Sequence, residues 1–479
     1  MAAFKNYVAG EWIDSDQTIV NRNPADLSDI VGEYARGDRA LVGRAVAAAQ
    51  AAWAKWAQTT PQERADILDR IGSELLARRE ELGRLLTREE GKVIADGIGE
   101  VVRAGAIFKF FAGEALRLSG EKIPSVRPGV EVEIAREPVG VVGIITPWNF
   151  PIAIPAWKIA PALAYGNCVL FKPAELVPGS AWALAEIIAR CGIPAGVFNL
   201  VMGSGSEVGS AICEAVGVDA VSFTGSTAVG SMIRRTVSGR GARVQLEMGG
   251  KNPLVVLDDA DLENAVTCAV NGAYFQTGQR CTASSRLIVT AGIHDRFVAM
   301  LVERLRQLVV GSGLDPATEI GPVVSEAQLV QDEKYLAIGR DEGARLVLGG
   351  ERLNRPTQGY YLAPALFTET STAMRINREE IFGPVAAVQR VKDFDAAVEA
   401  ANDTEYGLSS GICTRSLKYA SAFKRQSRAG MVMVNLPTAG VDYHVPFGGR
   451  KNSSYGPREQ GAYAREFYTA VKTTYVFPL

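Results

Sequence analysis

Four short apolar runs decide the fold: VGVVGIIT at residues 139–146, CVLFKPA at 168–174, FNLVMG at 198–203 and AVSFTGS at 220–226. Each run is nearly continuous in apolar residues, as expected for a strand buried on both faces. Segments with helical spacing, such as SAWALAEIIARCG at 180–192, separate the runs. Strands that alternate with helices in this way predict a doubly wound parallel sheet.

A second α/β series follows the first. It begins with NPLVVLDDADLENAVTCAVNGAYF at 252–275 and continues through SRLIVT at 285–290 and RVKDFDAAVEAAND at 390–403. The alternating segment 130–139 predicts an exposed strand or hairpin, and the tail 464–479 predicts a terminal strand. We therefore expect two α/β domains and a separate strand element built from the hairpin and the tail.

The first third of the chain is expected to be helical. The spacing predicts helices over 38–58, 59–92 and 97–120. The second opens with Thr60 and Glu63 around a proline, which is an N-cap with a capping-box acid.

Composition excludes several classes of protein. The chain has 479 residues, a net charge of -2 and no long block of one charge, so neither nucleic acid nor an anionic membrane is the expected partner. The N-terminus lacks the apolar core of a signal peptide, and no membrane-spanning segment is expected. We therefore expect a cytoplasmic protein. Six scattered cysteines, none in a C-x-x-C pair, and only two histidines argue against a metal site or histidine-based catalysis.

Cys281 lies in FQTGQRCTAS, residues 275–284, among small, polar and flexible residues. A nucleophilic cysteine needs a positive neighbour or backbone dipoles to stabilise its thiolate, and Arg280 is adjacent. A free thiol in a loop is the simpler interpretation. The other five cysteines lie in apolar segments and are predicted to serve packing.

Other polar residues stand where strands are expected to end. Asn149, in ITPWNFP, can donate its amide to an oxyanion, and Glu247, in QLEMGGKNP, is either paired or poised as a base. Glu175, in FKPAE, can accept hydrogen bonds from a ribose diol. SFTGSTAVGSMI at 222–233 forms a glycine turn at a helix N-terminus that suits a pyrophosphate, although it matches neither standard nucleotide fingerprint. Each motif alone is equally compatible with an ordinary turn or ion pair.

Together these motifs resemble the aldehyde dehydrogenase superfamily over essentially the whole chain. PWNFP, KPAE, FTGSTAVG, EMGGKNP, GQRC, EEIFGPV and PFGGRK occur in the family's order and spacing. Met248 stands where the family usually has leucine. The resemblance implies a Rossmann-like cofactor domain, a second α/β catalytic domain and a β oligomerisation element. It implies that the cofactor domain covers 1–122 and 140–248, the catalytic domain 249–456, and the oligomerisation element 123–139 and 457–479. It also implies a homodimer or homotetramer.

The resemblance also implies the chemistry. Cys281 would attack the aldehyde carbon, Asn149 would hold the oxyanion, Glu247 would activate the hydrolytic water, and Glu459 is a possible proton relay. No metal is implied. The cofactor would be NAD, with NADP possible, since the carboxylate of Glu175 repels a 2′-phosphate. The implied cofactor contacts are Ile145, Thr146, Trp148, Lys172, Glu175, Gly205, Gly225, Ser226, Gly230, Met248, Glu380 and Phe382.

The substrate is harder to predict. Arg103 lies on an otherwise apolar helical stripe, where it is either a snorkelling residue or a clamp for a substrate carboxylate. The segment 435–476 looks like the branch that oxidises 2,5-dioxopentanoate, so a semialdehyde acid is expected. Succinate semialdehyde and an aromatic aldehyde such as benzaldehyde or vanillin remain alternatives, as do a CoA-acylating relative, a cysteine hydrolase and a non-catalytic protein. The expected tunnel residues are Arg103, Phe150, Trp157, Phe275, Arg280, Thr282 and Thr438.

Overall fold

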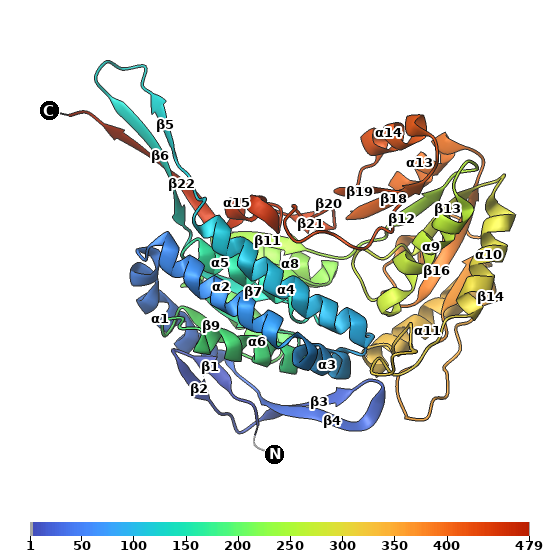
Figure 1. The fold of residues 1–479 in the computed structure, drawn as a ribbon, viewed down its shortest axis with the longest axis horizontal. Helices are drawn as coiled ribbons and strands as arrows, with labels where there is room; N and C mark the ends of the chain where they lie inside the picture. The colour runs from blue at the N-terminus through green and yellow to red at the C-terminus, as the bar shows by residue number, and fades with distance from the viewer. Residues whose placement is uncertain (1–2, 479) are drawn as a thin grey trace.

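The structure is a computed structural model that describes residues 3–478. Figure 1 shows two lobes side by side, with a narrow arm that projects from the first. Each lobe is built on its own sheet, as the two series of apolar runs predict. Within the described residues, no helix is long and apolar enough to cross a membrane.

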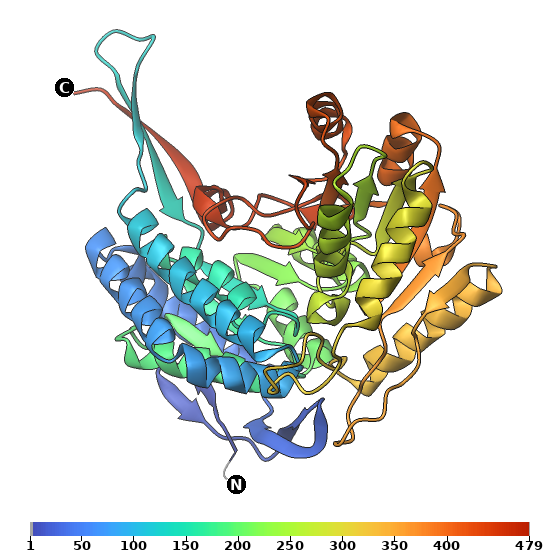
Figure 2. The ribbon, with the colours of Figure 1, turned by 45° about the vertical axis from the view of Figure 1, so that its right-hand side comes forward.

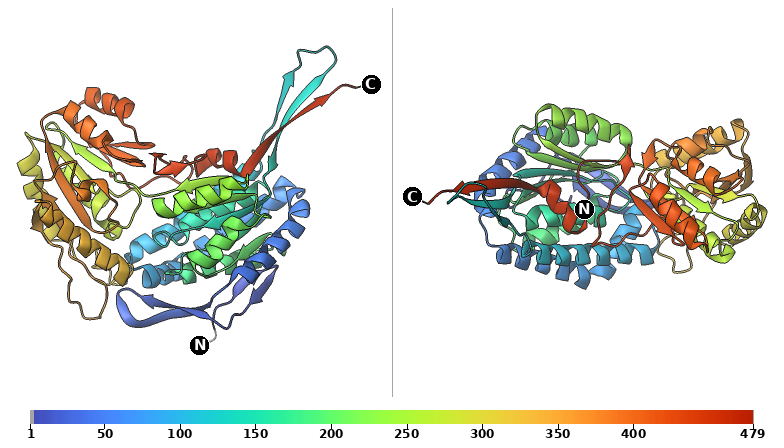
Figure 3. Two further views of the ribbon diagram at one scale, coloured as in Figure 1. Left: turned by 180° about the vertical axis from the view of Figure 1, so that it is seen from behind. Right: turned by 90° about the horizontal axis from the view of Figure 1, so that it is seen from above.

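The first lobe contains an eight-stranded sheet in the order β2-β1-β9-β8-β7-β10-β11-β21. Its five central strands run parallel and are almost fully buried, which confirms the prediction from the apolar runs. Helices cover both faces of this sheet, as the view from above in Figure 3 shows. The strands are β1 (Asn6–Val8), β2 (Glu11–Ile13), β7 (Val141–Ile145), β8 (Cys168–Lys172), β9 (Phe198–Leu200), β10 (Ala220–Thr224), β11 (Arg243–Glu247) and β21 (Ser454–Tyr455).

The second lobe contains a seven-stranded sheet in the order β14-β15-β16-β13-β12-β18-β19, in which only β14 is antiparallel. Val, Ile and Leu side chains of its central strands form the core with α9 and α10. The strands are β12 (Pro253–Val256), β13 (Arg286–Thr290), β14 (Arg345–Leu348), β15 (Ala365–Thr368), β16 (Val385–Val391), β18 (Ser409–Cys413) and β19 (Met431–Val434).

The arm is a three-stranded antiparallel sheet of β5 (Glu121–Pro124), β6 (Glu131–Pro138) and β22 (Thr469–Val476). The predicted hairpin and tail strand are therefore both present and paired. Leu479, the last residue of the predicted tail, lies outside the described residues, as do residues 1–2. In Figure 2 the arm extends away from both lobes. Two further small sheets consist of β3 (Thr18–Asn23) with β4 (Asp26–Ala35), and β17 (Tyr406–Gly407) with β20 (Arg450–Lys451).

The predicted domain boundaries stay a prediction, but the structure shows which core each segment joins. β21 pairs with β11, so the chain returns to the first sheet before residue 456. Phe467 and Tyr468 are buried in the core of the first lobe, and only β22 of the C-terminal segment lies in the arm.

The second N-terminal helix begins where its capping residues predict. α2 starts with the Thr60–Glu63 capping box, in which each side chain bonds the other residue's backbone N–H. The single helix expected over 59–92 is wrong in one respect, because it breaks at Arg78. Arg78 pairs with Glu81 and reaches Glu186 on α6, so contacts with a distant helix favour the break.

The helices of the first lobe are α1 (Arg39–Ala57), α2 (Pro61–Ala77), α3 (Arg79–Glu90), α4 (Ile94–Ala115), α5 (Ala153–Ala164), α6 (Pro178–Arg190), η1 (Gly205–Gly209), α7 (Ser210–Glu214), α8 (Thr227–Gly239), η3 (Gly461–Ala464) and α15 (Arg465–Tyr468). Those of the second lobe are α9 (Leu262–Ala273), η2 (Phe275–Gly278), α10 (His294–Arg306), α11 (Glu326–Asp341), α12 (Arg375–Arg378), α13 (Phe394–Asn402) and α14 (Leu417–Gln426).

Candidate active site

A cavity of about 610 Å³, here called the sheet cavity, lies at the C-terminal ends of β7, β8 and β10. The connections reverse direction between β7 and β10, and ligands of open parallel sheets bind at such a point. Eight of the predicted cofactor contacts line this cavity: Ile145, Thr146, Trp148, Lys172, Glu175, Gly205, Gly225 and Ser226.

The sheet cavity offers both charges and hydrogen-bond donors. α8 starts at its wall, capped by the hydroxyl of Ser226, which accepts from the Val229 N–H at 3.4 Å. Burial lowers the pKa of Lys172 to about 8, and the charge of Glu175 opposes that shift. The hydroxyls of Thr146 and Thr224 are buried and have no hydrogen-bond partner within residues 3–478.

A second cavity of about 260 Å³, the thiol cavity, shares Trp148, Gly225 and Ser226 with the sheet cavity and is therefore continuous with it. Its wall on the second lobe carries the Glu380 carboxylate, which accepts from the Gly250 N–H at 2.8 Å. Burial raises the pKa of Glu380 to about 7. The predicted residues that line this cavity are Trp148, Asn149, Gly225, Ser226, Met248, Cys281, Glu380 and Phe382.

Cys281 lies between the thiol cavity and a third cavity of about 240 Å³, and it lines both. Cys281 is half-buried and borders both cavities. Burial first, then the negative charges of Glu380 and Glu247, raise its pKa to about 12, while Arg280 acts in the opposite direction. Cys281 therefore rests as a thiol in this structure.

Asn149 reaches the same region from the end of β7. Its side-chain amide donates to the carbonyl of Gln279 at 3.0 Å, two residues before the thiol. An amide group has two N–H donors, so the second is available to the thiol cavity that Asn149 lines.

Glu247 ends β11 and is buried behind the cavity wall. It accepts a hydrogen bond from the Ser454 hydroxyl. Burial and the charge of Glu459 raise its pKa well above the usual range, while Ser454 and Lys158 act in the opposite direction. Glu459 is itself buried and paired with Lys158, and it accepts from the Ser222 hydroxyl at 3.2 Å. Three ionisable side chains thus form one buried cluster near the thiol.

The third cavity, the arginine cavity, lies on the opposite side of Cys281. Five of the predicted tunnel residues line it: Arg103, Phe150, Trp157, Arg280 and Thr282. Its walls are partly aromatic, since Trp157 stacks on Phe447 with ring centroids 5.3 Å apart.

Both guanidinium groups are only partly satisfied. Arg103 donates to the Val441 carbonyl and, at 3.0 Å, to the Gln460 side chain. Arg280 donates to two carbonyls at the end of α9. In each arginine the buried Nε has no partner, and neither pairs with a carboxylate, within the part of the chain that the structure describes. Burial lowers the pKa of both, that of Arg280 to about 10.

Three predicted contacts lie elsewhere. Phe275 lines a separate cavity with α9 and α10, because the chain turns sharply at the two left-handed residues that follow it. Thr438 is fully buried and donates to the Thr282 carbonyl at 2.7 Å, so it supports the wall from behind. Gly230 lies inside α8, where it makes room for Met248: a Cβ there would lie 2.4 Å from the Met248 sulfur.

Sequence reasoning missed other lining residues. Gln328 and Gln331 of α11 line the thiol cavity, and both donate to the Ile381 carbonyl. Asp96 and Phe447 line the arginine cavity. Gln328, Gln331 and Asp96 stand outside the motifs and carry no distinctive local pattern, whereas Phe447 belongs to the PFGGRK motif. Among residues 3–478, no group of three His, Cys, Asp or Glu side chains could hold a metal ion.

Comparisons with known proteins agree with this geometry. A model of the aldehyde dehydrogenase family matches residues 12–474. The chain is 44% identical over 482 residues to the alpha-ketoglutaric semialdehyde dehydrogenase of Bacillus subtilis, covering 99% of this chain and 98% of that protein. It is 40% identical over 472 residues to the 2,5-dioxopentanoate dehydrogenase of Saccharolobus solfataricus, covering 98% of each.

A solved structure gives the same result for the fold. The betaine aldehyde dehydrogenase of Staphylococcus aureus, in complex with NAD+, matches with a TM-score of 0.97 at 35% identity, covering 99% of this chain and 95% of that one. The fold class predicted from the sequence is therefore confirmed.

Proposed function

The chain belongs to the aldehyde dehydrogenase family, and from that premise we propose that it oxidises a semialdehyde acid, 2,5-dioxopentanoate, to the dicarboxylic acid. The overall reaction consumes the aldehyde, NAD+ and water and yields the acid, NADH and a proton. The proposal of an acidic substrate rests on Arg103 and Arg280. Both line the cavity that ends at Cys281, and neither has a carboxylate partner within residues 3–478.

Cys281 is the proposed nucleophile. Its sulfur bonds to the aldehyde carbon, and the thiol proton passes to Glu247, whose raised pKa suits it to accept and release protons. The oxyanion that forms accepts hydrogen bonds from the free N–H of the Asn149 amide and from the Cys281 backbone. After oxidation the product is a thioester, and Glu247 activates the water that breaks the carbon–sulfur bond. Lys158 and Glu459 lie behind Glu247 and form the proposed path for protons.

The sheet cavity suits a dinucleotide. The N-terminus of α8 provides backbone N–H donors for phosphate oxygens. Lys172 and Glu175 would hold the adenosine ribose, and Glu380, in the continuous thiol cavity, would hold the second ribose. NAD+, when bound, supplies the acceptor for the hydride that leaves the substrate carbon. Glu175 at the mouth favours NAD+ over NADP+ by charge repulsion.

The arginine cavity supports an acidic aldehyde for a physical reason. Buried charges are usually paired, yet Arg103 and Arg280 contact only neutral oxygens within residues 3–478. Two acids line the cavity: Glu100 is already paired with Lys92 at 2.8 Å, and Asp96 raises the pKa of Arg280 by its charge but forms no ion pair within the described residues. A substrate carboxylate in this cavity would face two guanidinium groups that form no ion pair within the described residues.

A panel of aldehydes tests this proposal. NADH formation would be followed with 2,5-dioxopentanoate, succinate semialdehyde, benzaldehyde and a neutral aliphatic aldehyde, each with NAD+ and NADP+. We expect kcat/KM to favour the acidic aldehydes by tenfold or more, equivalent to about 1.4 kcal/mol. Equal values for acidic and neutral aldehydes would contradict the assignment.

Aromatic aldehydes form the second candidate class. Phe150, Trp157 and Phe447 line the arginine cavity, and the stacked pair offers a flat wall for an aromatic ring. A preference for benzaldehyde in the same panel would mean that these rings, rather than the arginines, select the substrate.

We also propose that the arm mediates a homodimer or homotetramer. β22 is an edge strand, and such an edge pairs readily with another chain. Val471 and Tyr475 on this strand and Phe477 directly after it are exposed. Light scattering on the intact protein and on a variant that ends before β22 would test this, and an intact protein that is monomeric would refute it.

A further inference from the structure

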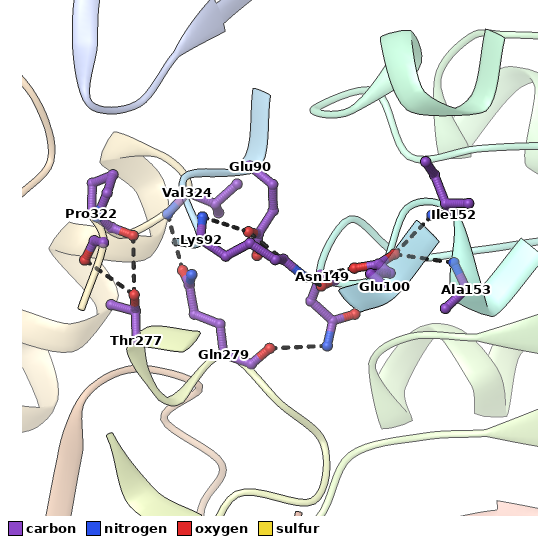
Figure 4. Close-up of polar contacts among 11 residues, drawn as sticks. Glu90, Lys92, Glu100, Asn149, Ile152, Ala153, Thr277, Gln279, Pro322 and Val324 are labelled. Atoms are coloured by element: carbon purple, nitrogen blue, oxygen red, sulfur yellow. Dashed lines mark hydrogen bonds and ion pairs between the residues drawn. The ribbon is translucent and has the colours of Figure 1, made fainter. Parts of the chain in front are cut away.

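The segment that carries Asn149 is held by a buried ion pair that lies outside the proposed catalytic set. This segment, residues 149–153, links the loop after β7 to the start of α5. Lys92 and Glu100 contact both of its ends, as Figure 4 shows. Both come from the α3–α4 region, far from Asn149 in the sequence.

Lys92 holds the first end. Its ammonium donates to the Asn149 carbonyl at 2.7 Å and to Glu100 at 2.8 Å, and it lies 4.3 Å from the centroid of the Phe150 ring. The side chain is 1% exposed, so these contacts take the place of water. Moving the Asn149 carbonyl would leave a buried ammonium with an unmet donor.

Glu100 holds the second end. One carboxylate oxygen accepts from Lys92, and the other accepts from the N–H groups of Ile152 at 2.9 Å and Ala153 at 3.0 Å. These N–H groups belong to the N-terminus of α5, where intrahelical partners are lacking. Glu100 therefore caps α5 from a different helix and links that cap to Lys92.

The Asn149 side chain is fixed from the opposite direction. Its amide donates to the Gln279 carbonyl, and the Gln279 side chain accepts from the Val324 N–H at 2.9 Å. Thr277 donates to the carbonyls of Gly321 and Pro322. Figure 4 shows the contacts of Gln279 joined to Asn149, with those of Thr277 beside them.

The loop before Cys281 needs such support because of its backbone. Gln276 and Thr277 have φ angles of 52° and 58°, in the left-handed region that non-glycine residues rarely adopt. Strained residues of this kind persist only where their surroundings hold them. The network therefore fixes the amide of Asn149 against a loop that is itself held in an uncommon conformation.

We infer that Lys92 and Glu100 are positioning residues for oxidation: they hold the Asn149 backbone so that the free N–H of its amide faces the substrate oxygen. This inference rests on the proposed role of Asn149 in the oxyanion site. One N–H of the amide donates to Gln279, so a small rotation of the segment would direct the second N–H away from the thiol cavity.

A double-mutant cycle tests the inference. Lys92→Met and Asn149→Ala would be measured alone and together, by single-turnover formation of NADH with saturating NAD+. We expect Lys92→Met to slow hydride transfer tenfold or more without changing the Kd for NAD+. In the Asn149→Ala background, the same change should have less than a twofold effect, because the group through which Lys92 acts is gone.

Two further variants distinguish an effect on folding from an effect on the position of Asn149. Lys92 also lies 3.9 Å from the buried Glu90 carboxylate, so Lys92→Met/Glu90→Gln/Glu100→Gln, which removes all three charges and keeps the side-chain shapes, should fold and show the same slow hydride transfer. Glu89→Gln is the matched control, because Glu89 is a buried acid that caps a different helix, accepting from the Gly179 and Ser180 N–H groups at 2.9 and 2.7 Å. It should lower Tm without slowing hydride transfer.

The outcomes separate the two claims. If Lys92→Met slows both backgrounds by the same factor, Lys92 does not act through Asn149 and the inference is overturned, while the proposed function stands. If Asn149→Ala leaves hydride transfer unchanged, the proposed role of Asn149 fails and the inference fails with it. If Glu89→Gln slows the reaction as much as the Lys92 variants do, the effect is one of general stability and the inference is overturned.

Discussion

Alkylation of Cys281 in the free protein should accelerate steadily with pH and reach no plateau below about pH 10. Burial and the negative charges of Glu380 and Glu247 raise the pKa of this thiol to about 12. At pH 8, a thiol with that pKa is about 0.01% thiolate, against about a quarter for an ordinary cysteine. A thiolate of higher pKa is intrinsically more nucleophilic, which offsets part of this deficit, so the reaction should be roughly ten- to a hundredfold slower than that of an exposed cysteine.

The assay is the rate of carbamidomethylation by iodoacetamide, followed by intact mass between about pH 6 and 10. The logarithm of the rate should rise by about one unit per pH unit, because only the thiolate reacts. The Cys281→Ala variant reports the background from the five other cysteines, all of which are buried.

Glu380→Gln provides the perturbation. The charge of Glu380 raises the pKa of Cys281, so removing it should lower that pKa and speed alkylation. The pKa of Glu380 is itself raised to about 7, so the gain should appear above pH 7, where this carboxyl is ionised, and fade below it. A plateau below about pH 9 in the unaltered protein, or slower alkylation of the variant above pH 7, would refute the electrostatic reasoning.

Three further predictions concern the site. Glu247→Gln should slow the burst of NADH, since it removes the acceptor of the thiol proton, and should slow steady turnover further, so that a covalent adduct of enzyme and acyl group accumulates in the mass spectrum; an adduct-free enzyme would contradict its role in hydrolysis. Arg103→Met should lower kcat/KM for acidic aldehydes by roughly 10- to 100-fold, since a charged hydrogen bond contributes about 1.5–3 kcal/mol, while neutral aldehydes change less than about twofold. Equal losses would remove Arg103 from substrate recognition. Gly230→Ala should destabilise the protein by about 1–3 kcal/mol, because the new Cβ would meet the Met248 sulfur at 2.4 Å, and an unchanged Tm would show that Met248 moves aside at little cost.

Local sequence signals predicted the elements well where short-range interactions govern them. The capping box at Thr60 begins α2, and the apolar runs form the central parallel strands. The break at Arg78 was not predictable from such signals, because Arg78 is held by Glu186 on α6, more than one hundred residues later. A pattern read along the chain contains no information about that partner.

The predicted site residues also fall into two groups, those that line the cavities and those that do not. Cys281, Asn149 and the predicted cofactor contacts mostly line the cavities, because motifs at strand ends converge where parallel strands finish. Phe275 and Thr438 lie beside the same motifs but face elsewhere. The direction of Phe275 depends on the left-handed turn at Gln276 and Thr277, which the residue types do not favour. The roles assigned to the site residues stay predictions until the variants are measured.

The sequence by itself determined the two sheets, the paired arm, the family and the residue types available for chemistry, since these follow from periodicity, caps and motif order. The tertiary structure decided which side chains face one another and in what charge state. Burial raises the pKa of Cys281, and Lys92 and Glu100 reach the Asn149 segment from distant helices. Both effects depend on the exclusion of water and on neighbours far away in the chain, which exist only once the chain has folded.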